Sequence, residues 1–159
     1  RRVLFRSELP ALAQRITKVL TVHGAKDPDR LQRLALVFSE LRAELDEHLH
    51  KEEVVLFPFI EQYARFAVRG LPMPPVPFGS IANPISVMER EHVSAGGALS
   101  EIHTLTDNFH PPAYACNTVR ALWEGLAALD ADLHRHIHLE NNILFPRAIA
   151  LEQASGRPA

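Results

Sequence analysis

The segment HLHKEEVVLFP, residues 48–58, recurs with few changes as HIHLENNILFP at residues 136–146. In each copy a histidine and a glutamate stand four positions apart, as His48 with Glu52 and as His136 with Glu140. Four residues of α-helix turn the chain by about 40° beyond a full circle and advance it by about 6 Å, so both side chains of a pair point to the same side. We therefore expect two helices that each present a histidine–glutamate pair on one face.

Around these segments, apolar residues recur at alternating steps of three and four, which is the pattern of amphipathic helices. Four such stretches cover residues 5–23, 31–59, 85–102 and 119–143. Helix start signals precede the second, third and fourth, at Asp27-Pro28, Asn83-Pro84 and Pro111-Pro112. No stretch alternates as a strand does. The sequence predicts an all-α fold, a four-helix bundle.

The apolar stripes continue past each glutamate. Val55 and Phe59 extend the stripe beyond Glu52, and Ile143 extends it beyond Glu140. A proline follows six residues after each glutamate, at positions 58 and 146. Because a proline inside a helix removes a hydrogen bond and bends the axis, we predict a kink at matching places in both helices.

Composition and length limit what the chain can be. Residues 70–79 carry four prolines, which exclude a helix and predict a long Pro-rich surface connection between the second and third helices. The 159 residues suit one domain, 1–159. A net charge of -2 gives no electrostatic reason to expect nucleic acid as a partner. The sequence contains no run of 18 apolar residues, so no membrane span is predicted. The single cysteine, Cys116, excludes an internal disulfide and suits a reducing cytoplasm. It is interpreted as a small packed residue, with a reactive thiol as the alternative.

Each predicted helix carries a histidine on its apolar face, and two of the helices add a glutamate. A buried carboxylate without a partner costs several kcal/mol, and a metal pair would offset two of them while binding neutral imidazoles. Imidazole and carboxylate together, without thiolate, suit iron, manganese or zinc. A purely structural repeat in a helical scaffold is the alternative. The predicted metal ligands are His23, His48, Glu52, His92, His136 and Glu140.

Residues next to these ligands have less certain roles on the sequence alone. Lys51 and Asn141 are interpreted as solvated groups or as neighbours of the ligands. For Glu91, which precedes His92, the expectation is exposure, with a role in polarising the site as the alternative.

The repeated segments, together with Glu8-Leu9-Pro10, Val22-His23-Gly24 and Met88-Glu-Arg-Glu-His92, resemble the hemerythrin-like domain. The resemblance is closest to the di-iron "repair of iron centres" proteins and covers essentially the whole chain. It implies two oxo- or hydroxo-bridged non-haem irons, with the four histidines as terminal ligands and Glu52 and Glu140 as bridges. It also implies repair of iron–sulfur clusters after nitrosative or oxidative damage, by donating iron or by handling nitric oxide. The implied partners are damaged iron–sulfur proteins and O2 or NO, and the implied location is the cytoplasm.

Two features depart from that family. Its members often carry a cysteine-containing N-terminal domain, which we do not expect in this chain. They also place a histidine on the first helix where this sequence has Arg2. A guanidinium does not ligate a metal cation and repels it. The sequence leaves open whether one iron has an open position, whether one iron or another metal binds, or whether the start of the chain is altered.

Two other functions remain alternatives at this point. One is a hemerythrin-like module that binds or senses O2 or NO. The other is an oxidoreductase that reduces nitric oxide at the two irons. The sequence does not decide whether the chain is an enzyme.

Overall fold

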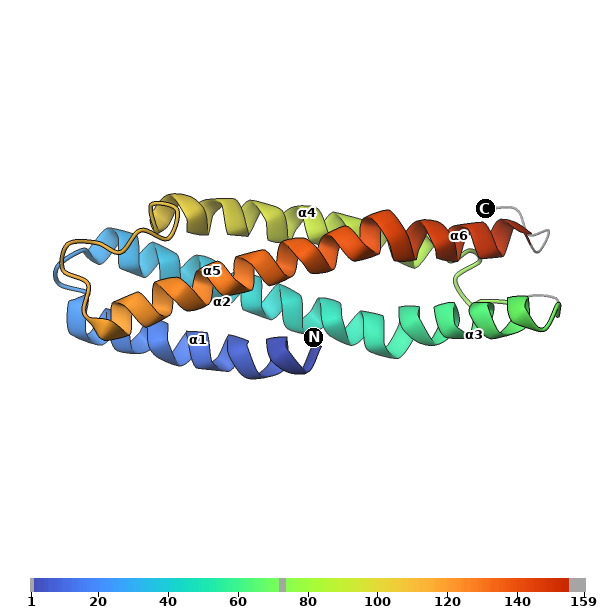
Figure 1. Ribbon diagram of the computed structural model, residues 1–159, viewed down its shortest axis with the longest axis horizontal. Helices are drawn as coiled ribbons and strands as arrows, with labels where there is room; N and C mark the ends of the chain where they lie inside the picture. The colour runs from blue at the N-terminus through green and yellow to red at the C-terminus, as the bar shows by residue number, and fades with distance from the viewer. Residues whose placement is uncertain (1, 72–73, 155–159) are drawn as a thin grey trace. The chain divides into compact units, whose positions relative to one another are not determined.

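The computed structural model describes residues 2–71 and 74–154, and only the backbone of residues 2–6. This part of the chain is helical and contains no strand (Figure 1), so the predicted all-α bundle is confirmed. The elements are α1 (Arg2–His23), α2 (Pro28–Lys51), the π-helical turn η1 (Glu52–Leu56), α3 (Phe57–Val68), α4 (Ala82–Leu105), α5 (Asn117–Leu139), the π-helical turn η2 (Glu140–Leu144) and α6 (Phe145–Ala154).

Packing divides the chain into two compact units, which are described separately. The first unit comprises Arg1–Leu45 and Ser94–His134, and the second comprises Asp46–Val93 and Arg135–Ala159. The first unit therefore holds α1 and parts of α2, α4 and α5. The second holds both π-helical turns, α3, α6 and the adjoining parts of α2, α4 and α5.

The core of the first unit consists of the apolar residues that the periodicity predicts. The stripe residue Phe5 lies outside the described side chains. Trp123 also joins this core and donates its indole N–H to the carbonyl of Thr106 over 3.2 Å. The buried stripe residues are Leu9, Leu12, Ile16, Val19, Leu31, Leu34, Phe38, Leu41, Leu45, Ala95, Leu99, Ile102, Val119, Leu122, Leu126, Leu129 and Leu133.

Of two predicted helix starts, one is confirmed by the structure and the other is wrong. The second helix begins at Pro28, as predicted, and the N–H of Leu31 bonds to the carbonyl of Asp27 over 3.1 Å. The fourth helix begins at Asn117, so the predicted start at Pro111-Pro112 is wrong. A proline disfavours helical backbone in the residue before it, which keeps position 111 out of a helix. The chain turns once more before α5, and Cys116 accepts the first helical bond, from the N–H of Arg120.

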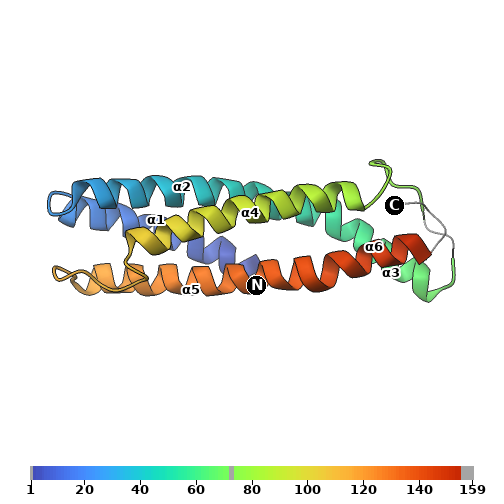
Figure 2. The same cartoon turned by 90° about the horizontal axis from the view of Figure 1, so that it is seen from above.

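In the second unit α3 packs against α6, and the two helices lie side by side (Figure 2). Part of the Pro-rich segment contributes to this core, because Val76 is buried there together with Ile81, which follows the segment. The expectation that residues 70–79 run entirely over the surface is therefore wrong at Val76. The core residues are Leu56, Ile60, Tyr63, Val76, Ile81, Ile85, Met88, Phe145 and Ala148.

A buried carboxylate, Glu152 of α6, ties three segments of the second unit together. It accepts hydrogen bonds from the hydroxyl of Tyr63 at 2.8 Å and from that of Ser80 at 2.6 Å. It also accepts the backbone N–H of Ile81, which precedes α4. These bonds satisfy an oxygen pair that would otherwise be costly to bury, and they attach the start of α4 to α3 and α6.

The two π-helical turns change the register of the apolar stripes. The N–H of Phe57 bonds to the carbonyl of Glu52, and that of Phe145 to Glu140, five residues back in both cases. The wider turn uses one extra residue, so the buried position after the glutamate moves on by one. The predicted inward positions Val55 and Ile143 are consequently wrong, since they are 37% and 40% exposed.

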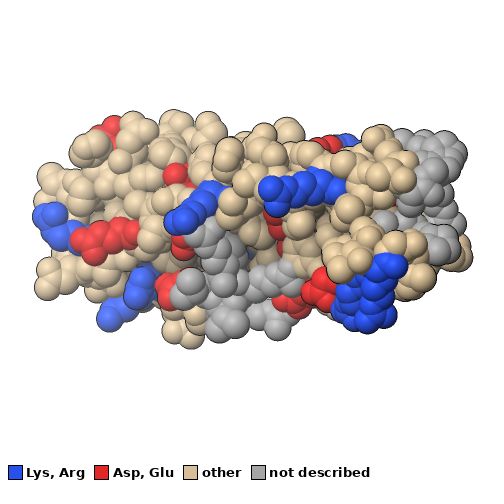
Figure 3. Space-filling model, turned by 45° about the vertical axis from the view of Figure 1, so that its right-hand side comes forward, with Lys and Arg blue, Asp and Glu red and all other residues tan. Residues whose placement is uncertain are grey.

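The surface shows no concentration of one charge on the face drawn in Figure 3, where basic and acidic side chains are interspersed. Such mixing fits the net charge of -2. Within the described residues, no helix has the length and apolar content needed to span a membrane.

Candidate metal centre

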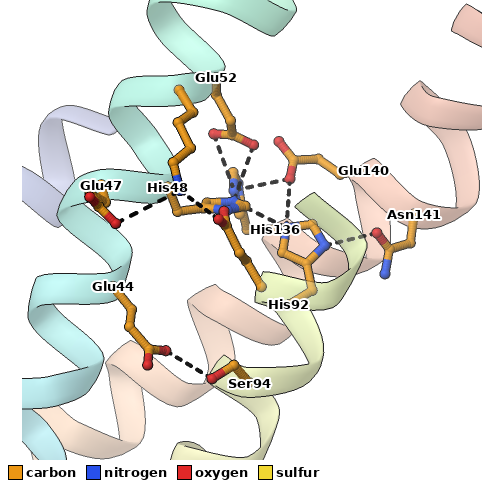
Figure 4. Close-up of polar contacts among 11 residues, drawn as sticks. Glu44, Glu47, His48, Glu52, His92, Ser94, His136, Glu140 and Asn141 are labelled. Atoms are coloured by element: carbon orange, nitrogen blue, oxygen red, sulfur yellow. Dashed lines mark hydrogen bonds and ion pairs between the residues drawn. The ribbon is translucent and has the colours of Figure 1, made fainter. Parts of the chain in front are cut away.

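Five of the six predicted ligands come together in the second unit (Figure 4). One ligand atom from each residue lies within 4.8 Å of every other, and all but His136 are buried. Both repeated segments contribute a pair, at the junctions of α2 with η1 and of α5 with η2, and α4 contributes the fifth residue. The five residues are His48, Glu52, His92, His136 and Glu140.

The spacing of the repeated segments produces the expected pairs. Nε2 of His48 lies 3.4 Å from Oε1 of Glu52, and Nε2 of His136 lies 3.3 Å from Oε2 of Glu140. Each carboxylate also faces a histidine of another helix, with Glu140 Oε2 at 3.2 Å from Nε2 of His92 and Glu52 Oε2 at 3.9 Å from Nε2 of His136. Both carboxylates therefore stand between imidazoles of two different helices, where they can take part in binding a cation.

Two of the imidazoles are oriented by contacts to their outer nitrogen. Nδ1 of His48 donates to Oε2 of Glu91 at 2.9 Å, and Nδ1 of His92 donates to Oδ1 of Asn141 at 2.8 Å. In the neutral rings this leaves a lone pair on each Nε2, and the two Nε2 atoms lie only 3.2 Å apart. Two facing lone pairs repel each other unless a proton or a metal cation lies between them.

Glu91 is held in place in turn, and so is the ring of His92. Nζ of Lys51 donates to Oε1 of Glu91 at 2.6 Å. The His92 ring stacks on Phe145 with the planes 4° apart and the centroids at 6.0 Å. Outer contacts of this kind fix ring orientation and tautomer in metal centres.

The two glutamates differ in their electrostatics. Burial raises the pKa of Glu140 to about 7, and the neighbouring Glu52 acts in the same direction. Burial also disfavours the charged form of Glu52, but the His48 imidazole and the Glu140 carboxyl outweigh it, so its pKa lies below the usual value. The pKa of His48 is raised, since Glu52 and Glu91 outweigh the effect of burial. At neutral pH Glu140 of the metal-free cluster is thus about half protonated, whereas Glu52 is ionised.

The donor set fits a metal. Both oxygens of Glu52, which is 0% exposed, and Oε2 of Glu140 are buried and accept no hydrogen bond. Buried carboxylate oxygens without donors are costly, and a bound cation satisfies them. Neutral imidazole and carboxylate ligands suit first-row transition metals. The cluster is therefore a group of residues that can hold a metal.

The sixth predicted ligand, His23, does not join this group. It lies at the last position of α1 in the first unit, where its Nε2 is 3.2 Å from Sγ of Cys116 and its ring packs near Tyr114. The inward face of α1 was predicted correctly. However, the 22 residues of α1 extend over about 33 Å at 1.5 Å per residue, and the face on which a residue lies does not set its position along that length. The side chain of Arg2, at the family's histidine position, lies outside the described residues.

Three neighbours of the cluster have clearer roles in the structure than on the sequence. The default expectation of exposure was wrong for Glu91, which bridges His48 and Lys51. Asn141, left between two roles, contacts His92. The signal for them in the sequence is their position next to a predicted ligand, since Glu91–His92 and Glu140–Asn141 are consecutive. Two histidines that lie two positions after a ligand, His50 and His138, are exposed.

The sequence of the chain matches a known class of cation-binding domain. The hemerythrin HHE cation-binding domain matches residues 5–148, so the chain belongs to this family. Within that class, it is 45% identical over 144 residues to the iron–sulfur cluster repair protein YtfE of Edwardsiella ictaluri (strain 93-146). It is also 45% identical over 145 residues to the proteins of the same name from Yersinia pestis (strain Pestoides F) and Yersinia pseudotuberculosis serotype IB (strain PB1/+).

These alignments cover most of this chain but a smaller share of each relative. They include 91% of this chain but 59% of the relatives. The chain therefore spans about three fifths of the length of the proteins it resembles.

Proposed function

We propose that this chain binds two iron ions and serves as the iron-holding domain of an iron–sulfur cluster repair protein. The observation that carries the proposal is the buried cage of three histidines and two glutamates in the second unit. The similarity to proteins named for iron–sulfur cluster repair supports the choice of iron and of this function. When bound, an iron pair would supply redox chemistry and iron that can be exchanged. A role under nitrosative or oxidative stress, in the cytoplasm, and damaged iron–sulfur proteins as partners belong to the same proposal.

The residues of the chain would have distinct tasks at such a centre. His48, His92 and His136 would offer Nε2 atoms to the metal, and Glu52 and Glu140, which lie between these rings, would offer carboxylate oxygens. Release of a proton from Glu140 would accompany metal binding, since a carboxylate binds a cation in its ionised form. Glu91 and Asn141 would hold two of the rings in the tautomer that presents Nε2.

The first test is the metal content of protein purified without added metal, together with its optical spectrum. We expect about two irons per chain and the charge-transfer bands of an oxo-bridged pair. In His136→Ala the iron content should fall, whereas His138→Ala, at an exposed position two residues later, should retain it. One iron per chain, or zinc alone, would contradict the di-iron centre.

The second test addresses repair. Iron-loaded protein is mixed with an iron–sulfur enzyme whose cluster has been damaged by nitric oxide, and recovery of enzyme activity is followed. We expect faster recovery than with an equal amount of free ferrous iron, and no acceleration with iron-free Glu52→Ala protein. Equal recovery with free iron would argue against repair, and reversible O2 binding by the reduced protein would favour a binding module instead.

A further inference from the structure

The first unit carries a cavity of about 560 Å³ that none of the five clustered residues lines. It is bordered by the C-terminal half of α4, by the turn that follows this helix and by the end of the part of α5 that belongs to this unit. The imidazoles of His103 and His134, a carboxylate, an amide and hydroxyl groups line it, and among the described residues no lysine or arginine does. Such a lining offers lone pairs and negative charge, which suit a cation.

A carboxylate that contacts both histidines of the cavity lacks hydrogen-bond donors. The side chain of Asp130 in α5 is 14% exposed, and its Oδ1 is buried and accepts no hydrogen bond. Two ring nitrogens nevertheless approach this oxygen, with Nε2 of His103 at 3.1 Å and Nδ1 of His134 at 3.4 Å. A buried carboxylate oxygen without a donor is costly, and a cation shared with the neighbouring nitrogens satisfies it.

The turn after α4 determines how the ring of His103 faces Asp130. Nδ1 of His103 lies 3.4 Å from Oδ1 of Asn108. Because an amide oxygen only accepts hydrogen bonds, the proton of the neutral ring lies on Nδ1, and Nε2 keeps its lone pair. The same arrangement holds Nδ1 of His92 against Oδ1 of Asn141 in the second unit. Contacts of this kind to the outer nitrogen orient histidines that bind a metal.

This turn is itself held in an unfavourable backbone conformation. Three successive residues, Asp107, Asn108 and Phe109, have φ values of 51°, 52° and 63°. Left-handed backbone of this kind is rare for residues that carry a Cβ. In this conformation Asp107 and Asn108 line the cavity, and the ring centroid of Phe109 lies 4.6 Å from that of His103. The strained turn therefore supports the His103 ring with two of its side chains.

Spacing along α5 adds a third ligand. Asp130 and His134 are four residues apart, as are the histidine–glutamate pairs of the repeated segments, and therefore lie on one side of the helix. Nδ1 of His134 donates to the backbone carbonyl of Asp130 at 3.0 Å, which leaves the lone pair on Nε2. The side chain of His134 is 63% exposed, so its ring can turn toward a cation next to Asp130 without disturbing the core.

The separation of the ligand atoms fits a small divalent ion. Two ligands at about 2.05 Å from a tetrahedral zinc ion lie about 3.3 Å apart. Nε2 of His103 and Oδ1 of Asp130, at 3.1 Å, are close to that separation as they stand. Only His134 has to change its side-chain conformation.

We propose that His103, Asp130 and His134 form a binding site for a divalent transition-metal ion such as zinc, in addition to the cluster of the second unit. His103 and Asp130 supply the two ligand atoms that are already in place, His134 supplies the third, and water from the cavity fills the remaining position. Imidazole and carboxylate are ligands that such ions accept where no thiolate is present. This site is independent of the proposed repair function, because it shares no residue with the five clustered ones.

The first measurement counts the zinc ions that the full chain binds after its metal has been removed with a chelator. Calorimetric titration with zinc should show one ion fewer in His103→Ala than in the unchanged protein. Asp130→Asn, which keeps the shape of the side chain and removes its charge, should weaken this one site by at least about tenfold. His110→Ala removes an exposed histidine of the same unit that does not line the cavity, and it should leave the number of ions unchanged.

The second measurement identifies the histidines that zinc covers. Imidazoles are modified with diethyl pyrocarbonate in the presence and absence of zinc, and the modified positions are mapped by mass spectrometry. Zinc should protect His103 and His134 and leave His110 reactive. The same protection should persist in His136→Ala, which separates this site from the cluster of the second unit.

Circular dichroism should establish that His103→Ala remains folded. If it does not fold, the modification of the unchanged protein still decides the question. An equal number of zinc ions in folded His103→Ala and in the unchanged protein would overturn the proposal. Equal modification of His103 with and without zinc, or loss of its protection in His136→Ala, would overturn it as well.

Discussion

Glu52 and Glu140 occupy the same position in the two repeated segments, yet their protonation differs. The cause is local, since the imidazole of His48, itself held by Glu91, lies close to Glu52 and favours its charge. For Glu140, burial and then the neighbouring ionised Glu52 raise the pKa to about 7, so it gives up its proton only near neutral pH. A repeat in sequence thus becomes an asymmetric pair through residues outside the repeat.

This asymmetry predicts a pH dependence for the metal-free protein. The pKa of Glu140 is raised from its ordinary value of 4.5 to about 7, so its stabilising contribution is complete below about pH 4.5 and is lost as the pH rises to about 7. The loss amounts to about 3 kcal/mol. This loss is measured by denaturant unfolding in the presence of a chelator. Between pH 4.5 and 7.5 the free energy of unfolding of Glu140→Gln should rise relative to that of the unchanged protein. A difference that does not vary with pH would contradict the protonated carboxyl.

The contact of Glu91 with His48 predicts an effect on metal affinity. Glu91→Gln should weaken metal binding by roughly 10- to 100-fold, because the ring of His48 loses its charged acceptor and with it part of its orientation and basicity. Affinity is measured by competition with a chromogenic chelator. Glu89→Gln, an exposed change on the same helix, is the matched control. Equal affinities in the two variants would argue against this role.

At the scale of the helices, the π-helical turns begin at the glutamates themselves and end just before the Phe-Pro pairs. The proline of each pair has no N–H and its ring disturbs the carbonyl four residues back, so a regular turn is disfavoured there. A turn with bonds five residues apart accommodates this and uses the extra residue. The prolines were visible in the sequence, but the form of the irregularity was not, because a kink and a π-helical turn satisfy the same local constraint.

Close approach of two helices leads to a second prediction, within the first unit. A Cβ added at Gly125 of α5 would lie 2.7 Å from Cδ2 of the buried Leu12 in α1, whereas one added at Gly97 of α4 meets nothing within 4 Å. Gly97→Ala should stabilise the protein by up to about 1 kcal/mol, the gain in helix propensity. In Gly125→Ala the same gain is offset by overpacking of about 1–3 kcal/mol. Thermal unfolding should therefore show Gly125→Ala to be the less stable variant by about that amount, and equal stabilities would show that Leu12 moves without cost.

For the whole molecule, metal binding should act as a stabilising ligand rather than as a condition for folding. The first unit has an apolar core that contains none of the five clustered residues, so we expect the metal-free chain to remain helical. Metal at about 100 times its dissociation constant should add about 2.7 kcal/mol. For a chain of this size that raises the midpoint of thermal unfolding by roughly 5–10 °C.

The measurement is a pair of thermal scans with ferrous iron and with a chelator. His136→Ala should lose the difference between the scans, and His138→Ala should keep it. Loss of helicity on chelation would instead show that the fold depends on the metal.

The sequence alone determined the helical architecture, most core positions and the two histidine–glutamate pairs, because these depend on periodicity within one helix. Spacing along a chain fixes the face of a helix on which a residue lies. Only the tertiary structure decided that His23 lies against Cys116, that Glu91 and Asn141 orient the rings, and that Leu56 rather than Val55 is buried. Those outcomes depend on the depth of a residue along the helix axis, on the partners that other helices bring to it, and on a change of register at a π-helical turn. None of the three is encoded in the period of a single helix.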